Sequence, residues 1–234
     1  MNIDAVFITY YPNVKLFEKA IKSIISQVRI AYIIDNTPEK CNHLEKLHEY
    51  SNINITYLCD NKGIAYAQNI GIKKSIEGNA DFIMLSDQHT IYPENYIKAM
   101  LSTFEGAKQV AAIAPLFKDE NSRMHNSGIY KKGLFFYKLF YPKKGIFEIP
   151  QAIASGKIIN TAHLSEIGLM KEDLFMDWID FEWCWRATRK GYKIIGNANV
   201  VITHQLGEHA ADIGFREVNL RSPVRHYYIT RNAF

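Results

Sequence analysis

A carboxylate and an imidazole lie two residues apart, at Asp87 and His89, directly after the apolar run 82–85. Four consecutive apolar residues between polar ones are typical of a strand that is buried on both faces. Ligands of open α/β sheets bind just beyond the carboxyl ends of such strands. An aspartate and a histidine at that point could bind a divalent cation, which could in turn hold a diphosphate. A polar turn that only ends the strand is the alternative that this segment leaves open.

Acidic and aromatic residues alternate in the segment 177–186, where a helix is expected to begin near Asp180. The helix dipole stabilises carboxylates in a first turn. Aromatic neighbours also change how readily a carboxylate takes up a proton, as a general base requires. Asp180 is therefore a candidate base. Two alternatives remain open: Asp180 could cap the helix, and Glu182 could pair with Arg186 four residues later.

The elements that position these residues follow from the spacing of apolar residues. Apolar runs in the first half predict strands over 4–9, 31–34, 54–58, 82–85 and 110–114, and helices over 15–28, 39–50, 64–76 and 93–104. This alternation predicts an α/β fold with a mostly parallel, doubly wound sheet. The carboxyl ends of parallel strands share one edge. We therefore expect one cleft to be lined by the polar residues that end the strands, namely Thr9, Asp35, Asp60, Asn61 and Asp87.

The second half of the chain is less regular. Strand-like residues on both sides of Lys131-Lys132-Gly133 predict a hairpin over 129–141. We further expect a strand over 154–159, a helix over 180–190 that closes at Gly191, and final strands over 192–195 and 199–202 that lead to His204.

The composition is that of a soluble globular protein. Apolar residues make up 47 % and charged residues 22 % of the 234 residues, which is ordinary for one folded domain. No long apolar stretch and no signal peptide occur, so we expect no spanning helix and no secretion. Three separated cysteines are typical of reduced thiols in the cytoplasm. A net charge of +4 without an aromatic and basic stripe argues against nucleic-acid binding.

Arginines gather near the end of the chain, at Arg216, Arg221, Arg225 and Arg231. Such a segment could contact phosphates or an anionic membrane surface. A solvated basic tail is the alternative.

Several segments together resemble glycosyltransferase family 2, and most of all its bacterial rhamnosyltransferases. In chain order they are Asp35-Asn36, the stretch 61–71 (NKGIAYAQNIG), Ser86-Asp87-Gln88-His89, Ser155-Gly156, the stretch 180–186 (DFEWCWR) with Gly191-Tyr192, and Arg231-Asn232. The resemblance covers nearly the whole chain, and the stretch 61–71 is its most specific part. It implies the GT-A fold, a Rossmann-like α/β fold in a single domain. Within it, about 1–115 would bind the nucleotide-sugar and about 116–234 would bind the acceptor and carry out catalysis.

The family likeness implies an inverting transferase that uses a nucleotide-sugar donor and a divalent cation, Mn²⁺ or Mg²⁺. One donor that it suggests is dTDP-rhamnose, which would supply L-rhamnose to a bacterial surface polysaccharide such as O-antigen or capsule. The acceptor would be a glycan or a lipid-linked glycan, reached in the cytoplasm with peripheral contact at the inner face of the plasma membrane. A UDP-hexose donor and an inactive nucleotide- or glycan-binding module remain alternatives.

The resemblance also assigns roles to single residues. Asp180 matches the catalytic base, and Asp35 would contact the nucleotide base. The other residues that would contact or shape the donor site are Thr9, Tyr10, Asn61, Gly63, Asn69, Asp87, Arg225, Tyr228 and Arg231.

Asp87 and His89 occupy the family's metal motif, and His204 matches a histidine that faces the metal or the diphosphate. His89 is a departure, because the family usually has a second aspartate there. Imidazole is a softer ligand that suits Mn²⁺ better than Mg²⁺ and makes metal binding more dependent on pH. Contact of His89 with the diphosphate, without metal, is the alternative.

Overall fold

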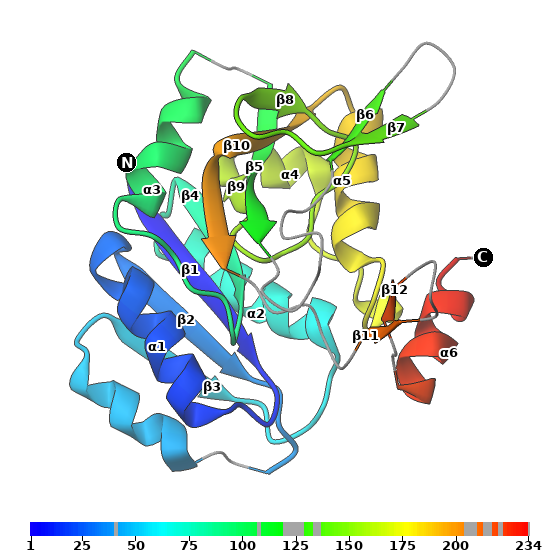
Figure 1. Cartoon of the computed structure of the whole chain (residues 1–234). Coiled ribbons are helices and arrows are strands. Elements are labelled where there is room, and N and C mark those ends of the chain that lie inside the picture. The colour runs from blue at the N-terminus through cyan, green and yellow to red at the C-terminus, as the bar shows by residue number, and fades with distance from the viewer. Residues whose placement is uncertain are drawn as a thin grey trace.

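A mixed sheet of eight strands forms the centre of the computed structural model, in the order β3-β2-β1-β4-β9-β5-β10-β8 (Figure 1). The structure describes residues 1–39, 42–106, 109–118, 129–132, 137–203, 210–212, 217–219 and 222–233. The strands are β1 (Ile3–Thr9), β2 (Ile30–Asp35), β3 (Ile53–Tyr57), β4 (Phe82–Asp87), β5 (Val110–Lys118), β8 (Ile146–Glu148), β9 (Ile158–Asn160) and β10 (Lys193–Thr203). All neighbours pair in parallel except those of β8 and β9. The predicted α/β fold with a mostly parallel sheet is confirmed.

Two small antiparallel pairs lie outside the main sheet. The predicted hairpin is present as β6 (Ile129–Lys132) and β7 (Tyr137–Phe140). The second pair consists of β11 (Ala210–Asp212) and β12 (Glu217–Asn219).

Helices cover both faces of the sheet (Figure 1). One face is covered by α1 (Val14–Ile24), the 3₁₀ segment η2 (Asn42–Glu49) and α3 (Tyr96–Leu101), and the other by α2 (Ile64–Glu77), α4 (Leu164–Ile167) and α5 (Ile179–Arg189). Short 3₁₀ turns are η1 (Ile25–Gln27), η3 (Ser102–Phe104), η4 (Thr161–His163) and η5 (Glu172–Leu174). The last helix, α6 (Pro223–Arg231), contacts the start of α5. None of the helices in these residues is long and apolar enough to cross a membrane.

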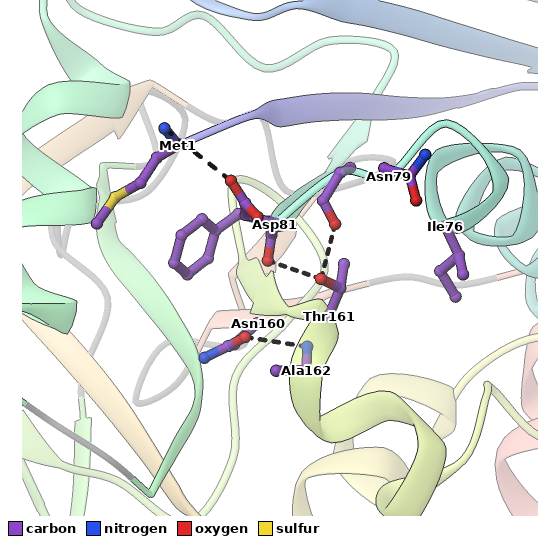
Figure 2. A pocket seen from close by; sticks show the side chains of 9 residues that line it. Met1, Ile76, Asn79, Asp81, Asn160, Thr161 and Ala162 are labelled. Carbon is purple, nitrogen blue, oxygen red and sulfur yellow. Dashed lines mark hydrogen bonds and ion pairs between the residues drawn. The ribbon is translucent and has the colours of Figure 1, made fainter.

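The amino ends of β1 and β4 border a pocket of about 580 Å³ (Figure 2). Its lining includes Met1, Asp81 and Thr161. The Thr161 hydroxyl donates to the carbonyl oxygens of Ala80 at 2.7 Å and Asp81 at 2.8 Å. None of the predicted site residues lines this pocket, which lies at the end of these strands opposite to Thr9 and Asp87.

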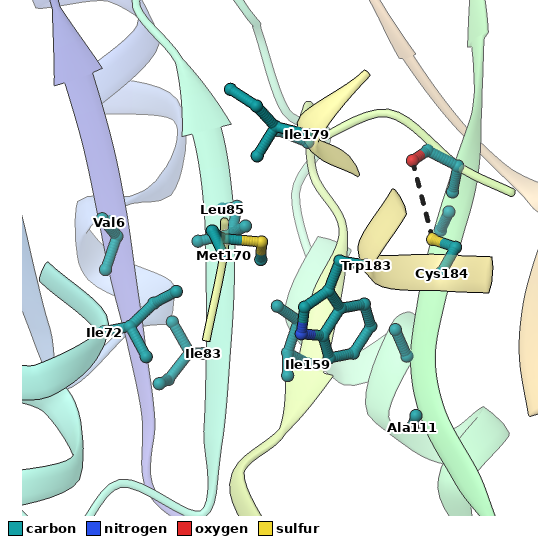
Figure 3. Close-up of a cluster of buried hydrophobic side chains, with 14 of the residues drawn as sticks. Val6, Ile72, Ile83, Leu85, Ala111, Ile159, Met170, Ile179, Trp183 and Cys184 are labelled. Carbon is teal, nitrogen blue, oxygen red and sulfur yellow. Dashed lines mark hydrogen bonds between the residues drawn. The ribbon is translucent and has the colours of Figure 1, made fainter. Parts of the chain in front are cut away.

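The apolar core lies on both faces of the sheet. In β1, Ala5 and Phe7 join the cluster on one face and Val6 joins the cluster on the other, because successive side chains of a strand point to opposite faces. Figure 3 shows the second cluster, where Trp183 of α5 packs near Ile159 of β9 and is fully buried. Burial on both faces explains why these strands are almost continuously apolar in sequence.

The polar strand ends lie in register. Thr9 pairs with Asp35 across β1 and β2, and Ile8 pairs with Asp87 across β1 and β4. The expected common edge of Thr9, Asp35 and Asp87 is therefore present.

Four element predictions need correction. The strand expected over 154–159 begins only at Ile158, because the preceding residues form a turn in which Gly156 has a φ of 78°. The strands predicted over 192–195 and 199–202 are one strand, β10, with a shift of register between Asn197 and Val201. The shift lies opposite Pro115, which has no N–H to donate to the ladder. The helix expected from Pro93 begins only at Tyr96, because Asn95 adopts a left-handed φ of 61°. The segment 39–50 has a 3₁₀ helix over Asn42–Glu49 where a longer helix was expected.

Candidate active site

Asp35, the last residue of β2, is fully buried, and only one of its two carboxylate oxygens has hydrogen-bond partners among the described residues. Its Oδ1 accepts hydrogen bonds from the hydroxyls of Thr9 at 2.9 Å and Thr37 at 2.7 Å. Its Oδ2 is buried and has no hydrogen-bond partner among the described residues. A buried acceptor without a donor is costly and therefore rare.

An amide chain fixes the loop before α2. Asn36 Nδ2 donates to Asn61 Oδ1 at 2.9 Å, and Asn36 Oδ1 accepts from the Lys62 N–H at 2.9 Å. Asn61 Oδ1 also accepts from the Gly63 N–H at 3.1 Å. This chain holds the residues that precede the first turn of α2, where the positive end of the helix dipole favours anions.

Tyr10 links the end of β1 to the Asp87-Gln88-His89 turn. Its N–H donates to Gln88 Oε1 at 2.9 Å, and Gln88 Nε2 donates to its carbonyl oxygen at 3.3 Å. The Tyr10 ring is exposed. Gln88 therefore positions this turn, a role that the sequence alone did not indicate.

Residues 154–157 join Asp87 to Asp180. The Ser155 hydroxyl donates to Asp87 Oδ2. The Ala154 N–H and the Lys157 ammonium each donate to one oxygen of Asp180 at 2.9 Å. One four-residue segment thus holds the two carboxylates that the sequence singled out.

Lys157 was not predicted as a site residue. Its side chain is fully buried and its ammonium lies 5.6 Å from the centre of the Trp183 ring. Burial is the largest single effect and lowers the pKa of Lys157, but Asp180, Cys184 and Asp87 together raise it by more, so the net shift is upward. A lysine within the apolar run 157–159 was a signal that could have been used, because a buried lysine needs a counter-charge.

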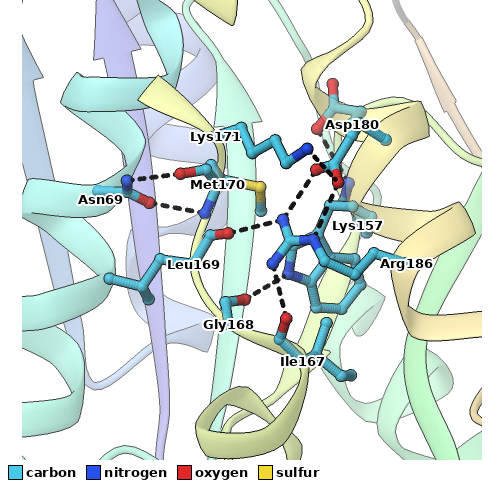
Figure 4. Close-up of polar contacts among 11 residues, drawn as sticks. Asn69, Lys157, Ile167, Gly168, Leu169, Met170, Lys171, Asp180 and Arg186 are labelled. Atoms are coloured by element: carbon cyan, nitrogen blue, oxygen red, sulfur yellow. Dashed lines mark hydrogen bonds and ion pairs between the residues drawn. The ribbon is translucent and has the colours of Figure 1, made fainter. Parts of the chain in front are cut away.

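Asp180 does not cap its own helix. The N-cap of α5 is Trp178, without a side-chain capping bond, and Asp180 follows as the second helical residue. Glu182 does form the expected pair with Arg186, through bonds of 2.9 and 2.8 Å. Arg186 also donates to the carbonyl oxygens of Ile167 and Leu169 (Figure 4), which fixes α5 against the loop after α4.

Asn69 has both ends of its amide bound inside the protein (Figure 4). It donates to the carbonyl oxygen of Met170 and accepts from the Met170 N–H, both at 2.9 Å, and it donates to Glu172 at 2.8 Å. The side chain is 2 % exposed. In this structure Asn69 therefore supports the segment 170–172, and any effect on the donor site would pass through that segment.

The α6 residues lie against the segment before α5. Arg225 binds Asp177 through two hydrogen bonds, Tyr228 stacks on Phe175, and Arg231 donates to the Asp173 carbonyl oxygen. Their expected contact with a diphosphate stays a prediction.

The structure describes only one of the two histidines of the expected metal site. His89 lies in the turn directly after Asp87, whereas His204 lies outside the described residues, as do Arg216 and Arg221. Within the described part of the chain, no group of three or more His, Cys, Asp or Glu side chains is placed to hold a metal ion.

Comparisons with known proteins show what this chain is similar to. The family model described as glycosyl transferase family 2 matches residues 5–167, which contain the ends of β1, β2 and β4 and the segment 154–157. The chain is 30 % identical over 235 residues to dTDP-rhamnosyl transferase RfbF of Shigella flexneri, covering 100 % of this chain and 79 % of that protein.

Solved structures share the fold. GalNAc-T7 with UDP, GalNAc and Mn²⁺ superposes with a TM-score of 0.72 at 14 % identity, over 88 % of this chain and 44 % of that chain. Mannosyltransferase PcManGT from Pyrobaculum calidifontis, in complex with GDP-Man and Mn²⁺, gives 0.63 at 11 % identity, over 92 % and 58 %. The chain thus spans about half the length of these two solved chains. Since the family model matches well over half of the chain, the protein belongs to glycosyl transferase family 2 and is a glycosyltransferase with the GT-A fold.

Proposed function

We propose that the protein transfers a sugar from a nucleotide-sugar donor to an acceptor hydroxyl with inversion, and that Asp180 is the base. The observation that carries this proposal is the segment 154–157, which holds Asp87 at the sheet edge and orients Asp180 at the start of α5. Asp180 would take the proton of the acceptor hydroxyl while the acceptor oxygen bonds to the anomeric carbon. The bond from that carbon to the phosphate oxygen breaks, and its electrons leave with the nucleoside diphosphate.

The donor would lie along the shared strand edge. Oδ2 of Asp35 would accept an N–H of the nucleotide base, since it is buried and has no other donor in the described residues. Around it would lie the other proposed donor-site residues, Thr9, Tyr10, Asn61 and Gly63. Asn69 would act on the donor site only indirectly, through the segment 170–172. The first turn of α2 would favour the negative diphosphate.

The residues at the end of β4 provide some of the ligands that a divalent cation needs. Asp87 provides a carboxylate and His89 an imidazole, a donor set compatible with Mn²⁺. Because no third ligand of this kind lies with them in the described residues, the diphosphate oxygens would have to complete the coordination. When bound, the cation stabilises the charge that develops on the leaving diphosphate. The hydrogen bond from the Ser155 hydroxyl would hold the carboxylate of Asp87 in place for the cation.

The proposed donor is dTDP-rhamnose, supported by the rhamnosyl transferase from Shigella flexneri. The proposed acceptor is a glycan, free or lipid-linked, of a bacterial surface polysaccharide. Exposed Val224 and Tyr227 beside Arg225 on α6 are compatible with peripheral contact at an anionic membrane. A UDP-hexose donor is the second candidate.

A thermal-shift screen tests the donor. The melting temperature is measured with dTDP-rhamnose, UDP-glucose, UDP-N-acetylglucosamine and GDP-mannose, each with and without Mn²⁺. Binding to the native state raises the midpoint, and we expect the largest rise with dTDP-rhamnose and Mn²⁺. A larger rise with a UDP-sugar would favour the second candidate, and no rise with any of them would contradict the proposal.

Asp180→Asn tests the base. Transfer should fall by about 10²–10⁴-fold, the usual contribution of a general base, while the affinity for dTDP measured by calorimetry should stay within about twofold. Asp81→Asn, at the opposite end of the sheet, is the control and should keep full activity. Near-normal turnover of Asp180→Asn would remove Asp180 from the mechanism.

Donor hydrolysis separates an enzyme from an inactive binding module. We expect slow release of dTDP from dTDP-rhamnose without acceptor, lost in Asp87→Ala and on chelation. A protein that binds the donor but neither hydrolyses nor transfers it would be a binding module.

A further inference from the structure

The turn before α5, residues 174–178, has an unusual backbone. Phe175, Asp177 and Trp178 have φ angles of 63°, 57° and 63°. Side chains with a Cβ disfavour this region. Phe175, with ψ of −65°, forms the centre of a tight turn in which the Met176 N–H donates to the Leu174 carbonyl oxygen at 2.7 Å. Such a conformation persists only where neighbouring groups hold it.

Residues of α6 and Asn232, which follows it, supply those groups. Asn232 Nδ2 donates to the carbonyl oxygens of Leu174 at 2.8 Å, Met176 at 2.9 Å and Asp177 at 3.3 Å. One amide thus binds three carbonyls of the same turn. An aspartate at this position could accept hydrogen bonds but could not donate them.

Side-chain contacts add to this amide. Arg225 donates to both carboxylate oxygens of Asp177, at 3.2 and 2.6 Å. The rings of Tyr228 and Phe175 stack at 4.8 Å with an angle of 16°. The Trp178 indole donates to the Ile229 carbonyl oxygen at 3.0 Å. Every residue of the turn with a positive φ is therefore in contact with α6.

The other side of the turn contacts the loop before α2. The Phe175 carbonyl oxygen accepts from the Ile64 N–H, the first of that helix, at 2.7 Å. A Cβ built on Gly63 would lie 2.6 Å from the Phe175 ring. Only Ile179 separates the end of the turn from Asp180. The turn therefore spans from the proposed donor loop to the proposed base.

We propose that Asn232 and Arg225 are positioning residues: through α6 they hold the turn 174–178, and the turn sets Asp180 relative to the donor loop. This inference rests on the proposed role of Asp180. It differs from the expectation that Arg225 binds the diphosphate, and the two roles respond differently to changes at Asp177. If Arg225 binds the diphosphate, loss of the Asp177 charge would free Arg225 and change the affinity for the nucleotide. If Arg225 is a positioning residue, the same loss would loosen the turn 174–178.

Three variants test this proposal. Asn232→Asp removes the amide donor with little change in size, Asp177→Asn weakens the pair with Arg225, and Asn79→Asp is the control. Asn79 also has a positive φ, of 55°, but lies at the opposite end of the sheet. If Asn232→Asp does not fold, Asp177→Asn carries the test, since Asp177 lies partly at the surface.

Hydrogen exchange and dTDP binding are measured on each full-length variant. We expect exchange of the amides of 174–182 to be at least tenfold faster in Asn232→Asp and Asp177→Asn, and unchanged in Asn79→Asp. The dissociation constant of dTDP with Mn²⁺ should stay within about twofold. With dTDP-rhamnose at saturation, turnover should fall at least tenfold.

Two results would overturn the proposal. One is unchanged exchange of 174–182 in both variants. The other is a tenfold change of dTDP affinity in Asp177→Asn with unchanged exchange, which would make Arg225 a diphosphate ligand. If the parent protein binds none of the nucleotides, the proposed function fails, whereas the exchange measurement still decides whether α6 holds the turn.

Discussion

Lys157 and Asp180 form the most deeply placed ion pair near the proposed reaction site among the described residues. The lysine side chain is fully buried and the aspartate side chain is 22 % exposed. The pair fixes one oxygen of Asp180, and the Ala154 N–H orients the second oxygen, which would accept the proton in the proposed mechanism. Removing one partner of a buried pair leaves the other uncompensated, which is usually costly.

Lys157→Met should lower both stability and turnover. It keeps most of the apolar side chain but removes the ammonium, so we expect the free energy of unfolding to fall by about 1–3 kcal/mol, the cost of leaving a buried polar group unsatisfied. Urea denaturation of the parent, Lys157→Met, Asp180→Asn and the double variant gives the coupling energy. We expect the double variant to be more stable than the sum predicts, by about 0.5–3 kcal/mol. Additive losses would show that the two side chains do not support each other.

At the scale of elements, the loop before α2 and the turn before α5 must fit closely. Gly63 has φ of 86° and ψ of 161°, a region used almost only by glycine. A Cβ there would also lie 2.7 Å from the Phe175 carbonyl oxygen and 2.9 Å from its Cα. Backbone atoms cannot rotate away as the end of a side chain can.

Gly63→Ala should therefore be more costly than an alanine at another glycine of the same φ. Gly191 is the matched control, because its φ is 87° and no atom lies within 4 Å of an added Cβ. We expect Gly191→Ala to cost about 1–2 kcal/mol from conformation alone and Gly63→Ala clearly more, with weaker dTDP binding. Equal unfolding free energies in chemical denaturation would contradict the close contact with Phe175.

At the scale of the whole molecule, the buried ionisable groups set how stability depends on pH. Burial raises the pKa of Tyr92 and of Tyr96 above the ordinary value. The unfolded chain therefore loses these protons at lower pH than the native protein does. Lys157, whose pKa is also raised, acts in the same direction, since its stabilising charge is kept below its ordinary pKa and lost as pH rises through its native value.

Stability should therefore fall above about pH 10, the ordinary pKa of tyrosine. Each buried tyrosine contributes a slope of up to about 1.4 kcal/mol per pH unit. Tyr96→Phe should make this slope shallower, although it costs about 1 kcal/mol at neutral pH through the lost bond to Gly156. Denaturation midpoints from pH 8 to 11.5 measure the slope, with Tyr227→Phe as the control. A slope that Tyr96→Phe leaves unchanged would argue against this origin.

The sequence predicted the residues at the strand ends better than it predicted the contacts in the second half of the chain. Thr9, Asp35 and Asp87 could be placed on one edge because each ends an apolar run and parallel strands end together. The partners of Gln88 and Lys157 could not be assigned, because Tyr10 and Asp180 lie 78 and 23 residues away from them. The antiparallel course of β9 between β4 and β5 was also missed, because its apolar run carries no mark of direction.

The sequence by itself determined the alternation of strands and helices, the polar residues at the strand ends and the acidic start of α5. These are local properties, because side-chain period and polarity act between near neighbours along the chain. Only the tertiary structure decided that Lys157 pairs with Asp180, that Asn69 binds Met170 and that Asn232 binds the turn 174–178. The last two contacts join residues 101 and 56 positions apart, and such groups meet only after the sheet and its helices have packed.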